Sequence, residues 1–505
     1  MLREENTQLF LGPPGTGKTT TLLGVVETEL NNGVPPDRIG FVSFTKKATN
    51  EAVDRAMKRF NVEARDLPFF RTLHSMAFGG LGVKRSQVLQ KEHYRQFGDA
   101  LGEIITGAGP GEDGLFGARA TSGDVMLFID SLARTRRVSL YSQWKQIAPD
   151  GVEWSSQERF SRALSKFKND LNILDFTDML ERYPNEGYVP KLEALIVDEA
   201  QDLSVLQWAV VERLAAQAKR VYIGGDDDQA IYRWAGADVE RFLDLRGVRH
   251  ILHKSYRLPV EIHTSAMQIV KRIKHRIDKP FSSRDDKGLV GFHNDFEDVD
   301  MSQGTWLVLA RNSYLLRPLE QYVRQRGWLY ESKTFHADGS ASVQAMVDWE
   351  RLRRGRELTP DRIRNIYKHM TVDVGVRRQF RDLPGVNEEE PLSLQQLKDS
   401  FGLLTDAIWH EALDRISAQD RQYYVSVLKS GEKLTERPRI KISTIHAAKG
   451  GEADNVLLMS DMSQRTWEDW QRFPDDEHRV FYVGATRARE SLHVVSARGG
   501  RGYDL

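Results

Sequence analysis

Short apolar runs alternate with stretches of helical periodicity in the first part of the chain. Residues 8–11 and 39–44 are short, mainly apolar runs of the kind that form buried strands. After the second run, residues 46–60 carry apolar side chains at the spacing of one helix face. The order of strand, helix, strand and helix predicts a parallel sheet of the α/β class.

The same alternation returns further along the chain, after long helical stretches. Helical periodicity dominates the residues that follow the first strands, and charge-rich helical patterns also follow a second set of strands. The pattern therefore predicts two α/β cores, each interrupted by a mainly helical insertion. We expect the first core in residues 1–79 and 172–256, its insertion in 80–171, the second core in 257–331 and 438–505, and its insertion in 332–437.

Composition limits the class of protein. The 505 residues exceed what one hydrophobic core usually spans, and the absence of cysteine excludes disulfide bonds, cysteine-ligated zinc and iron–sulfur clusters. No apolar stretch approaches the ~20 residues of a membrane span, and the N-terminus lacks the pattern of a signal peptide. We therefore expect a cytoplasmic protein that is neither secreted nor membrane-bound. The 72 basic and 72 acidic side chains balance, so a nucleic acid would have to bind through local basic and aromatic surface.

The segment GPPGTGKT, residues 12–19, follows the first predicted strand and precedes a helix. In this context G-x-x-x-x-G-K-[ST] indicates a phosphate-binding loop, whereas a chance turn rich in glycine and proline is the alternative. Lys18 would bind the β- and γ-phosphates and Thr19 would ligate Mg²⁺, while backbone N–H groups bind the phosphate oxygens. The expected nucleotide contacts in this loop are Gly12, Pro13, Pro14, Gly15, Thr16, Gly17, Lys18, Thr19 and Thr20.

A later apolar run, ALIVDEAQD, ends in paired carboxylates. Hydrolysis of a phosphoanhydride needs one carboxylate to hold Mg²⁺ and a second group to orient the water. Asp198 suits the first role and Glu199 the second. A strand can also end in Asp-Glu for solubility alone, so this pair carries weight only together with the phosphate loop.

The order of these and other segments resembles the superfamily 1 helicases of the UvrD, Rep and PcrA type. The resemblance covers nearly the whole chain and implies two RecA-like P-loop NTPase cores, 1A and 2A, with insertions 1B and 2B. The segments that carry it are GPPGTGKT, FVSFTKKATNEAVDR, RTLHS, DFTDML, VDEAQD, GDDDQAIYRWAGA, KSYRLP, STIHAAKGGEADNV and FYVGATRARESL.

The resemblance implies roles around the nucleotide. Gln229 would contact the γ-phosphate or the attacking water, and Arg257 and Arg487 would reach the γ-phosphate from the second core. Tyr256 would stack on the base of ATP, and Glu452 would accept a hydrogen bond from the ribose. The residues implied in catalysis are thus Lys18, Asp198, Glu199, Gln229, Arg257 and Arg487.

The resemblance also assigns a DNA side. Tyr232 and Trp234 would lie under bases of single-stranded DNA, and the aspartates 226–228 would join the Mg²⁺ and water network around Glu199. The alternative is that the two aromatics belong to the core and the aspartates form a turn. The histidines could equally be hydrogen-bonded structural residues. The further candidate DNA contacts are Phe44, Thr45, His74, Thr444 and His446.

Some positions depart from the family pattern. Ala235 stands where relatives carry an arginine, unless Arg233 substitutes, and Gly451 and Ala453 replace larger apolar residues. No Q motif precedes the phosphate loop, so strict preference for ATP over GTP is not expected. The 2B insertion is expected to be shorter than in relatives.

These observations favour an ATP- and Mg²⁺-dependent translocase on single-stranded DNA that unwinds duplex, 3′ to 5′ by resemblance, in repair, recombination or replication. Single-strand/duplex junctions would be its partners in a bacterial or phage-host cytoplasm. A monomer is the default, with dimerisation on DNA and an accessory repair or replication protein left open. One alternative is a translocase that strips proteins from single strands without processive unwinding. The other is a P-loop NTPase switch that does not act on nucleic acid.

Overall fold

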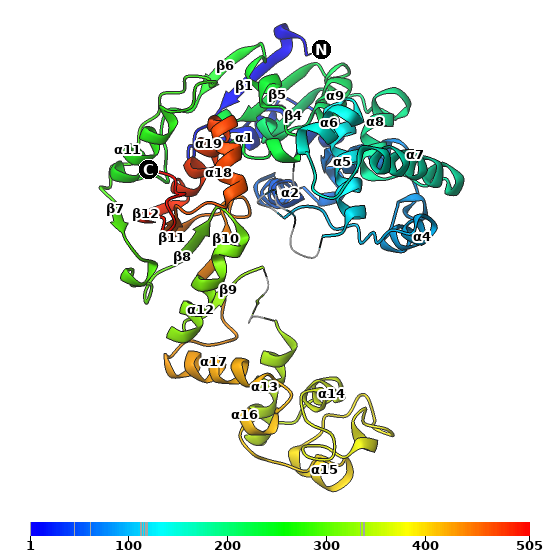
Figure 1. Ribbon diagram of the computed structural model, residues 1–505, viewed down its shortest axis with the longest axis vertical. Coiled ribbons are helices and arrows are strands. Elements are labelled where there is room, and N and C mark those ends of the chain that lie inside the picture. The colour runs from blue at the N-terminus through cyan, green and yellow to red at the C-terminus, as the bar shows by residue number, and fades with distance from the viewer. Residues whose placement is uncertain are drawn as a thin grey trace.

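Two parallel sheets of six strands form the centre of the molecule (Figure 1). The computed structural model describes residues 2–44, 46–60, 62–111, 114, 116, 120–333, 335–336 and 339–505. Helices flank both sheets, and helical segments interrupt both cores (Figure 1). The predicted α/β fold with two RecA-like cores is therefore confirmed, whereas the residue boundaries of the four parts remain predictions.

The first sheet has the strand order β3-β2-β4-β5-β1-β6. All five residues of β4 are buried, as a central strand covered on both faces requires. Because the strands are parallel, the segments that follow β1, β4 and β5 leave the sheet at the same edge. The strands are β1 Thr7–Leu11, β2 Ile39–Ser43, β3 Phe70–Thr72, β4 Ala194–Asp198, β5 Arg220–Gly225 and β6 Val248–Ile251.

The second sheet has the strand order β7-β12-β11-β8-β10-β9. Its central strand β8 is likewise buried at every residue. The strand β10 enters this sheet after a long helical excursion and pairs in parallel with both β8 and β9. The strands are β7 Leu289–His293, β8 Trp306–Ala310, β9 Tyr330–Glu331, β10 Ile440–Thr444, β11 Ala453–Met459 and β12 Ala488–Val495.

Helices bury the apolar faces of both sheets. On the first sheet, α1 and α2 pack on one face and α3, α8 and α9 on the other. On the second sheet, α11 and α19 pack on one face and α12 on the other. The helices of the two cores, including α10 and α18, are α1 Lys18–Asn31, α2 Lys46–Phe60, α3 Leu73–Gly80, α8 Phe176–Glu186, α9 Val205–Ala215, α10 Val239–Leu243, α11 Val260–Val270, α12 Leu316–Arg326, α18 Gln464–Arg472 and α19 Pro474–Ala485.

The two insertions differ in how they are anchored. The helices of the first share a small core of their own, which includes Phe97, Phe160 and Leu164. The second forms a lobe that projects away from both sheets (Figure 1), yet its buried residues continue the apolar core on one face of the second sheet. The helices are α4 Lys91–Leu101, α5 Ser122–Arg136, α6 Leu140–Ile147 and α7 Trp154–Leu171 in the first insertion, and α13 Ala341–Arg353, α14 Pro360–Lys368, α15 Leu394–Ser400, α16 Trp409–Ala412 and α17 Ala418–Lys429 in the second.

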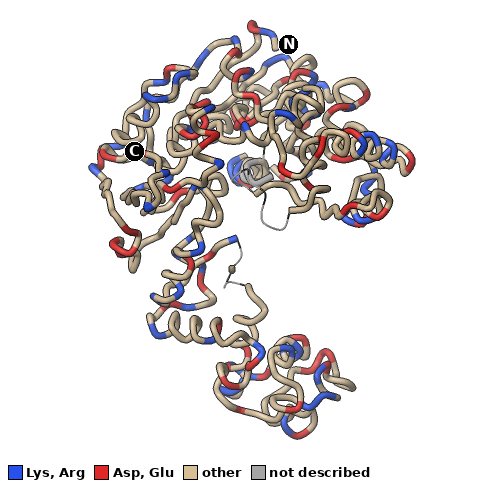
Figure 2. The backbone as a smooth tube through the Cα atoms, viewed as in Figure 1, with Lys and Arg blue, Asp and Glu red and all other residues tan. Residues whose placement is uncertain are grey.

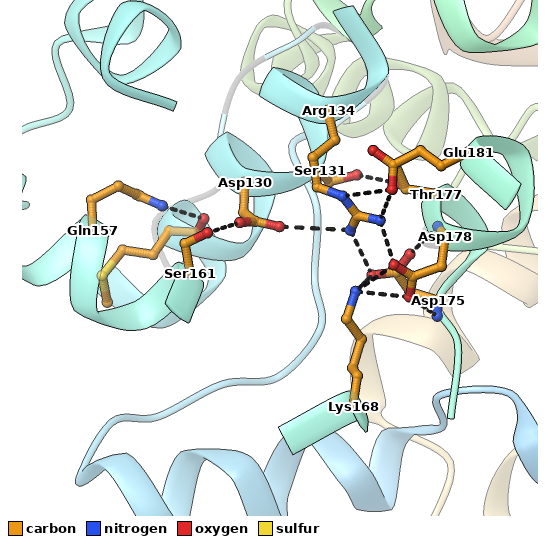
Figure 3. A network of polar contacts seen from close by, with 11 residues as sticks. Asp130, Ser131, Arg134, Gln157, Ser161, Lys168, Asp175, Thr177, Asp178 and Glu181 are labelled. Carbon is orange, nitrogen blue, oxygen red and sulfur yellow. Dashed lines mark hydrogen bonds and ion pairs between the residues drawn. The ribbon is translucent and has the colours of Figure 1, made fainter. Parts of the chain in front are cut away.

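A network of ion pairs joins the first insertion to the first core (Figure 3). The Arg134 guanidinium lies 3.0 Å from Asp175, 2.5 Å from Asp178 and 2.5 Å from Glu181. Lys168 adds contacts of 2.6 Å to Asp175 and 2.8 Å to Asp178. Burial opposes ionisation of Asp175, but Arg134 and Lys168 lower its pKa to about 2. The DFTDML segment therefore caps α8 and also holds α5 and α7 against it.

Charge is distributed over all parts of the chain. Basic and acidic residues are interspersed along both cores and both insertions (Figure 2), in keeping with the net charge of zero. None of the helices in the described ranges is long and apolar enough to cross a membrane.

We expect Arg134→Met to destabilise the first core by about 3–5 kcal/mol, because it leaves partly buried carboxylates without their main cation. Urea unfolding followed by circular dichroism measures this loss. The control is Lys166→Met, which removes an exposed pair with Asp170 within α7 and should cost no more than about 0.5 kcal/mol. Equal losses in the two variants would show that the network contributes no more than a surface ion pair.

Candidate active site

The phosphate loop leaves the first sheet after β1 and ends at α1, whose first residue is Lys18. Gly15 and Gly17 have φ values of +74° and +79°, which favour glycine. A Cβ atom on Gly15 would lie 2.4 Å from the Cβ of Arg257, so only glycine permits this approach of the second core. A hydrogen bond beside this contact holds the two segments together: Ser255 Oγ donates to the Pro14 carbonyl at 2.7 Å.

A cavity of 410 Å³ lies over this loop and is lined from both cores. It brings together every residue that the sequence predicted around the nucleotide: Gly12 to Thr20, Asp198, Glu199, Gln229, Tyr256, Arg257, Glu452 and Arg487. Arg55, Asp202, Lys449 and Arg489 also line the cavity. The predicted roles of the individual residues remain predictions.

Lys18 and two carboxylates form the floor of the cavity. The Lys18 ammonium lies 2.9 Å from Glu199, and burial of Lys18 is outweighed by Glu199 and Asp198, which raise its pKa. Burial also opposes ionisation of Glu199, but Lys18 and Lys449 lower its pKa to about 2. Glu199 is therefore an ionised carboxylate that would compete with a nucleotide phosphate for Lys18.

Thr19 and Asp198 are suited to a divalent cation. The Thr19 hydroxyl donates to Asp198 at 3.0 Å, so two oxygen atoms meet where the phosphate loop faces β4. Burial raises the pKa of Asp198 to about 6. Mg²⁺ is usually held by one or two such oxygens together with phosphates of the substrate, so the donor set fits this ion. Among the described residues, no three His, Cys, Asp or Glu side chains gather to hold a metal by themselves.

The second core contributes two arginines to the cavity. Arg257 donates to Glu452 at 2.6 Å and to the Thr486 carbonyl at 3.3 Å. Arg487 is 2% exposed, and its guanidinium donates to the Gln229 side-chain oxygen at 3.0 Å. Burial and the neighbouring Arg257 lower the pKa of Arg487 to about 9.

The two residues predicted at the base and ribose occupy the rim. Tyr256 has 71% of its surface exposed, while its backbone N–H donates to Gly15 at 2.8 Å. Glu452 pairs with Arg257 and lies 3.5 Å from Arg489. An exposed ring fixed by its backbone to the phosphate loop can cover a flat ligand without rearrangement of the loop.

Several predicted DNA contacts gather beside the cavity. The rings of Phe44 and Tyr232 stack with centroids 5.4 Å apart, and Lys449 lies over the Tyr232 ring at 5.1 Å. Trp234 is half-buried, and Gly114 of the first insertion packs against its indole ring. These aromatics lie where the two cores and the first insertion meet, and Phe44 and Tyr232 also pack against hydrophobic cores, so the alternative of core aromatics stays open.

The remaining candidates differ in environment. His446 is 1% exposed, neither ring nitrogen has a hydrogen-bond partner among the described residues, and burial lowers its pKa well below the usual value. The Thr444 hydroxyl accepts from the Ala447 N–H at 3.2 Å. His74 packs edge-on against Phe176. Thr45 lies outside the described residues.

Arg233, the candidate substitute for the arginine that is missing at position 235, contacts the second core. Its guanidinium lies 3.5 Å from Asp476 and 5.0 Å from the centre of the Phe473 ring, both in the second core. Its backbone carbonyl accepts a hydrogen bond from Arg136 of the first insertion at 2.6 Å. Arg233 thus joins three parts of the chain beside Trp234.

The expectation that all three aspartates of GGDDDQ surround Glu199 needs correction. Asp227 and Asp228 lie against Lys279 and Arg276 of the second core instead. Adjacent buried carboxylates need nearby cations, and Glu199 could only repel them. No pattern in the sequence indicated these cations, because Arg276 and Lys279 lie in an irregular segment without a motif.

Gln201 was also missed, although it belongs to the VDEAQD segment. Its side-chain nitrogen donates to Glu199 at 2.6 Å, and its oxygen accepts from the Asp226 N–H at 3.0 Å. Lys449 pairs with Asp202 at 2.5 Å. The D-E-x-Q-D motif could have indicated both residues, since Gln201 and Asp202 come within three positions of Glu199 in the same segment.

Comparison with known proteins now adds a family to this geometry. A family model described as UvrD-like helicase C-terminal domain matches residues 119–499, and one described as AAA domain matches residues 1–235. The chain belongs to the UvrD-like helicases. The resemblance drawn from the sequence motifs is thereby confirmed.

Two of the curated relatives of this UvrD-like helicase align with nearly all of the chain. A protein named Probable DNA helicase II homolog from Rickettsia conorii is 24% identical over 98% of this chain and 91% of its own length. ATP-dependent DNA helicase PcrA from Bacillus subtilis is 26% identical over 97% of this chain and 80% of its own. ATP-dependent DNA helicase Rep from Buchnera aphidicola is 25% identical over 56% of this chain and 43% of its own length. The first alignment spans 625 positions, more than the 505 residues here, so that relative contains segments that this chain lacks.

We expect Glu199→Gln to tighten the binding of a nucleoside triphosphate about tenfold, or about 1.4 kcal/mol. The substitution frees Lys18 from its ion pair and removes a carboxylate that repels phosphate. Equilibrium titration with a fluorescent, slowly hydrolysed ATP analogue measures the change. Glu29→Gln is the matched control, since Glu29 is a buried carboxylate of α1 that pairs with Arg220 outside the cavity and should not affect affinity. Unchanged or weaker binding by Glu199→Gln would contradict the competition for Lys18.

Proposed function

We propose that this UvrD-like helicase is a DNA-stimulated ATPase that moves along single-stranded DNA, 3′ to 5′, and unwinds duplex. The observation that carries the proposal is the cavity shared by both cores, in which Lys18 of the first core faces Arg257 and Arg487 of the second. A cleft built from two cores couples hydrolysis to their closure. The names of the relatives, which are DNA helicases, support the same activity.

In this proposal, Lys18 binds the β- and γ-phosphates, and Thr19 and Asp198 hold Mg²⁺. Bound Mg²⁺ would offset the negative charge of the phosphates. Glu199 would orient the attacking water. Once phosphate takes Lys18, the contact that now lowers the pKa of Glu199 is lost, and the carboxylate becomes a stronger base.

The second core supplies the groups that stabilise charge on the transferred phosphoryl. Arg257 and Arg487 would contact the γ-phosphate when the cleft closes, and Gln229 would contact the γ-phosphate or the water. Arg257 must then exchange Glu452 for phosphate, which leaves Glu452 free to accept from the ribose. Tyr256, exposed at the rim, would stack on the base.

Coupling to DNA would run through the short segment from Gln229 to Trp234. Bases stacked on Tyr232 and Trp234 would contribute about 1–3 kcal/mol each and tolerate any sequence, as a motor requires. Phe44 would extend this surface, together with Thr45 and His74, whereas Thr444 and His446 are buried and would reach a base only after the cores move. Loss of the γ-phosphate releases Arg487 and Gln229, and the same segment then shifts the stacked base.

The finer biological assignments are part of the proposal. Single-strand/duplex junctions are the proposed substrate, in repair, recombination or replication in the cytoplasm, with a monomer as the default state. Dimerisation on DNA and an accessory repair or replication protein fit the same activity. The second candidate is a translocase that strips proteins from single strands, which is favoured by the alignment showing that a relative has segments that this chain lacks.

Steady-state ATP hydrolysis with and without oligo-dT tests the central claim, with GTP in parallel. We expect strong stimulation by oligo-dT in the wild type and no measurable hydrolysis by Lys18→Ala. A strand-displacement assay beside a protein-displacement assay then separates unwinding from stripping. Active but unstimulated hydrolysis would favour a P-loop NTPase switch that does not act on nucleic acid.

We expect Trp234→Ala to keep its basal ATPase activity and to lose stimulation by oligo-dT, because the indole is proposed to contact a base and not the nucleotide. Trp234→Phe keeps a flat ring and should retain most of the stimulation. Initial rates over a range of oligo-dT concentrations measure both variants. Stimulation of Trp234→Ala equal to that of the wild type would falsify the coupling segment.

A further inference from the structure

Three consecutive aspartates follow β5 and are almost completely buried. Asp226 and Asp227 are 0% exposed and Asp228 is 2% exposed. An unpaired carboxylate in such surroundings costs several kcal/mol or takes up a proton. The segment can hold three carboxylates only if cations from elsewhere in the fold meet them.

The cations come from the irregular segment between α11 and β7 of the second core. Lys279 is 1% exposed, and its ammonium lies 3.3 Å from Asp226 and 3.0 Å from Asp228. It also forms an ion pair with Asp227. Arg276 forms a bidentate pair with Asp228 at 2.9 and 2.8 Å. Burial opposes the charge on Lys279, but the three carboxylates raise its pKa above the usual value. We call these five residues the aspartate cluster.

The two cations meet different members of the aspartate cluster. In the part of the chain that the structure describes, the ion pair of Asp226 is with Lys279, whereas Arg276 pairs with Asp228 and the exposed Asp278. Removal of either cation breaks buried ion pairs, but only removal of Lys279 leaves Asp226 unpaired.

Asp226 connects this cluster to the cavity. Its second carboxylate oxygen accepts a hydrogen bond from the Gln229 side-chain nitrogen at 2.7 Å. That bond orients the amide so that its oxygen accepts from Arg487 at 3.0 Å. The chain of contacts therefore runs from Lys279 through Asp226 and Gln229 to Arg487, and it crosses between the cores twice.

The series of contacts from Lys279 to Arg487 depends on an ionised Asp226. A protonated Asp226 is a weaker acceptor than the carboxylate, and its hydroxyl would face a second donor if it turned to the Gln229 amide nitrogen, so the amide would be held less firmly. Burial raises the pKa of Asp226 to about 6 even beside Lys279, so little margin remains if the cation is removed.

We propose that Lys279 is a positioning residue for ATP hydrolysis, which holds Asp226 so that Gln229 and Arg487 are presented to the γ-phosphate. The inference rests on the proposed ATPase function. Lys279 does not touch the cavity, so it affects the turnover of bound ATP and not the affinity for it. A role in stability alone would instead make Lys279 and Arg276 equivalent.

The test compares Lys279→Met with Arg276→Met in the full-length chain. We expect Lys279→Met to lower the oligo-dT-stimulated kcat about 100-fold, because a misplacement of about 1 Å at the reacting centre has effects of this size. The dissociation constant for a fluorescent ATP analogue should stay within about threefold of the wild type. Arg276→Met should retain kcat within about threefold, although it breaks a bidentate pair in the same cluster.

The outcomes are distinct. A lowered kcat in Lys279→Met with unchanged ATP affinity and an active Arg276→Met supports the inference. Equal kcat in the two variants, or a loss of ATP affinity in Lys279→Met, overturns it. If the wild type shows no stimulation by oligo-dT, the proposed function fails instead, and basal kcat then provides the comparison of the two variants.

A second variant covers the case in which Lys279→Met does not fold. Lys279→Met combined with Asp227→Asn removes one buried charge of each sign, so it restores the charge balance of the aspartate cluster while Asp226 still lacks its cation. We expect this double variant to unfold cooperatively at a temperature near that of Asp227→Asn and to retain the loss of kcat. A double variant as active as Asp227→Asn would overturn the inference.

Discussion

Buried charge between the two sheets is the constraint on which this structure depends. The phosphate loop places an ammonium, Lys18, where the carboxylates of Asp198 and Glu199 leave the sheet, and neither sign can be buried alone. The second core closes the arrangement with cations of its own, among them Arg487 and Lys279. Each core therefore lacks part of its charge balance without the other, and the cleft proposed to bind nucleotide is also the joint between them.

The same arrangement suits the proposed response to a nucleotide. A γ-phosphate would bring negative charge to Lys18, which pairs here with Glu199, and to Arg257, which pairs here with Glu452. Phosphate could replace both carboxylates without leaving a cation unpaired. In the proposed mechanism, this exchange would release Glu199 for water and draw the two arginine-bearing segments toward the first core. Binding energy would then be used for closure of the cleft.

The residues proposed to contact DNA are held by neighbours from three regions. Trp234 lies between Gly114 of the first insertion and His446 of the second core, while Arg233 beside it reaches Asp476. The network around Arg134 anchors α5, and the end of α5 reaches the same segment through the bond from Arg136 to the Arg233 carbonyl. The position of the indole is therefore set by the first insertion as well as by the cores. A shift of the first insertion or of either core would therefore move the Trp234 ring, which is part of the proposed DNA-contacting surface.

The sequence by itself determined the two α/β cores, the helical insertions and the set of residues around the nucleotide, because these depend on local periodicity and on motifs whose spacing is set by one loop or one strand end. GPPGTGKT and VDEAQD are such motifs, and their residues do meet in one cavity. Only the tertiary structure decided which charges pair. The aspartates beside Gln229 were expected near Glu199, but they lie against Lys279 and Arg276, about 50 positions later in the chain, since ion pairing depends on distance in space and leaves no periodic trace in the sequence.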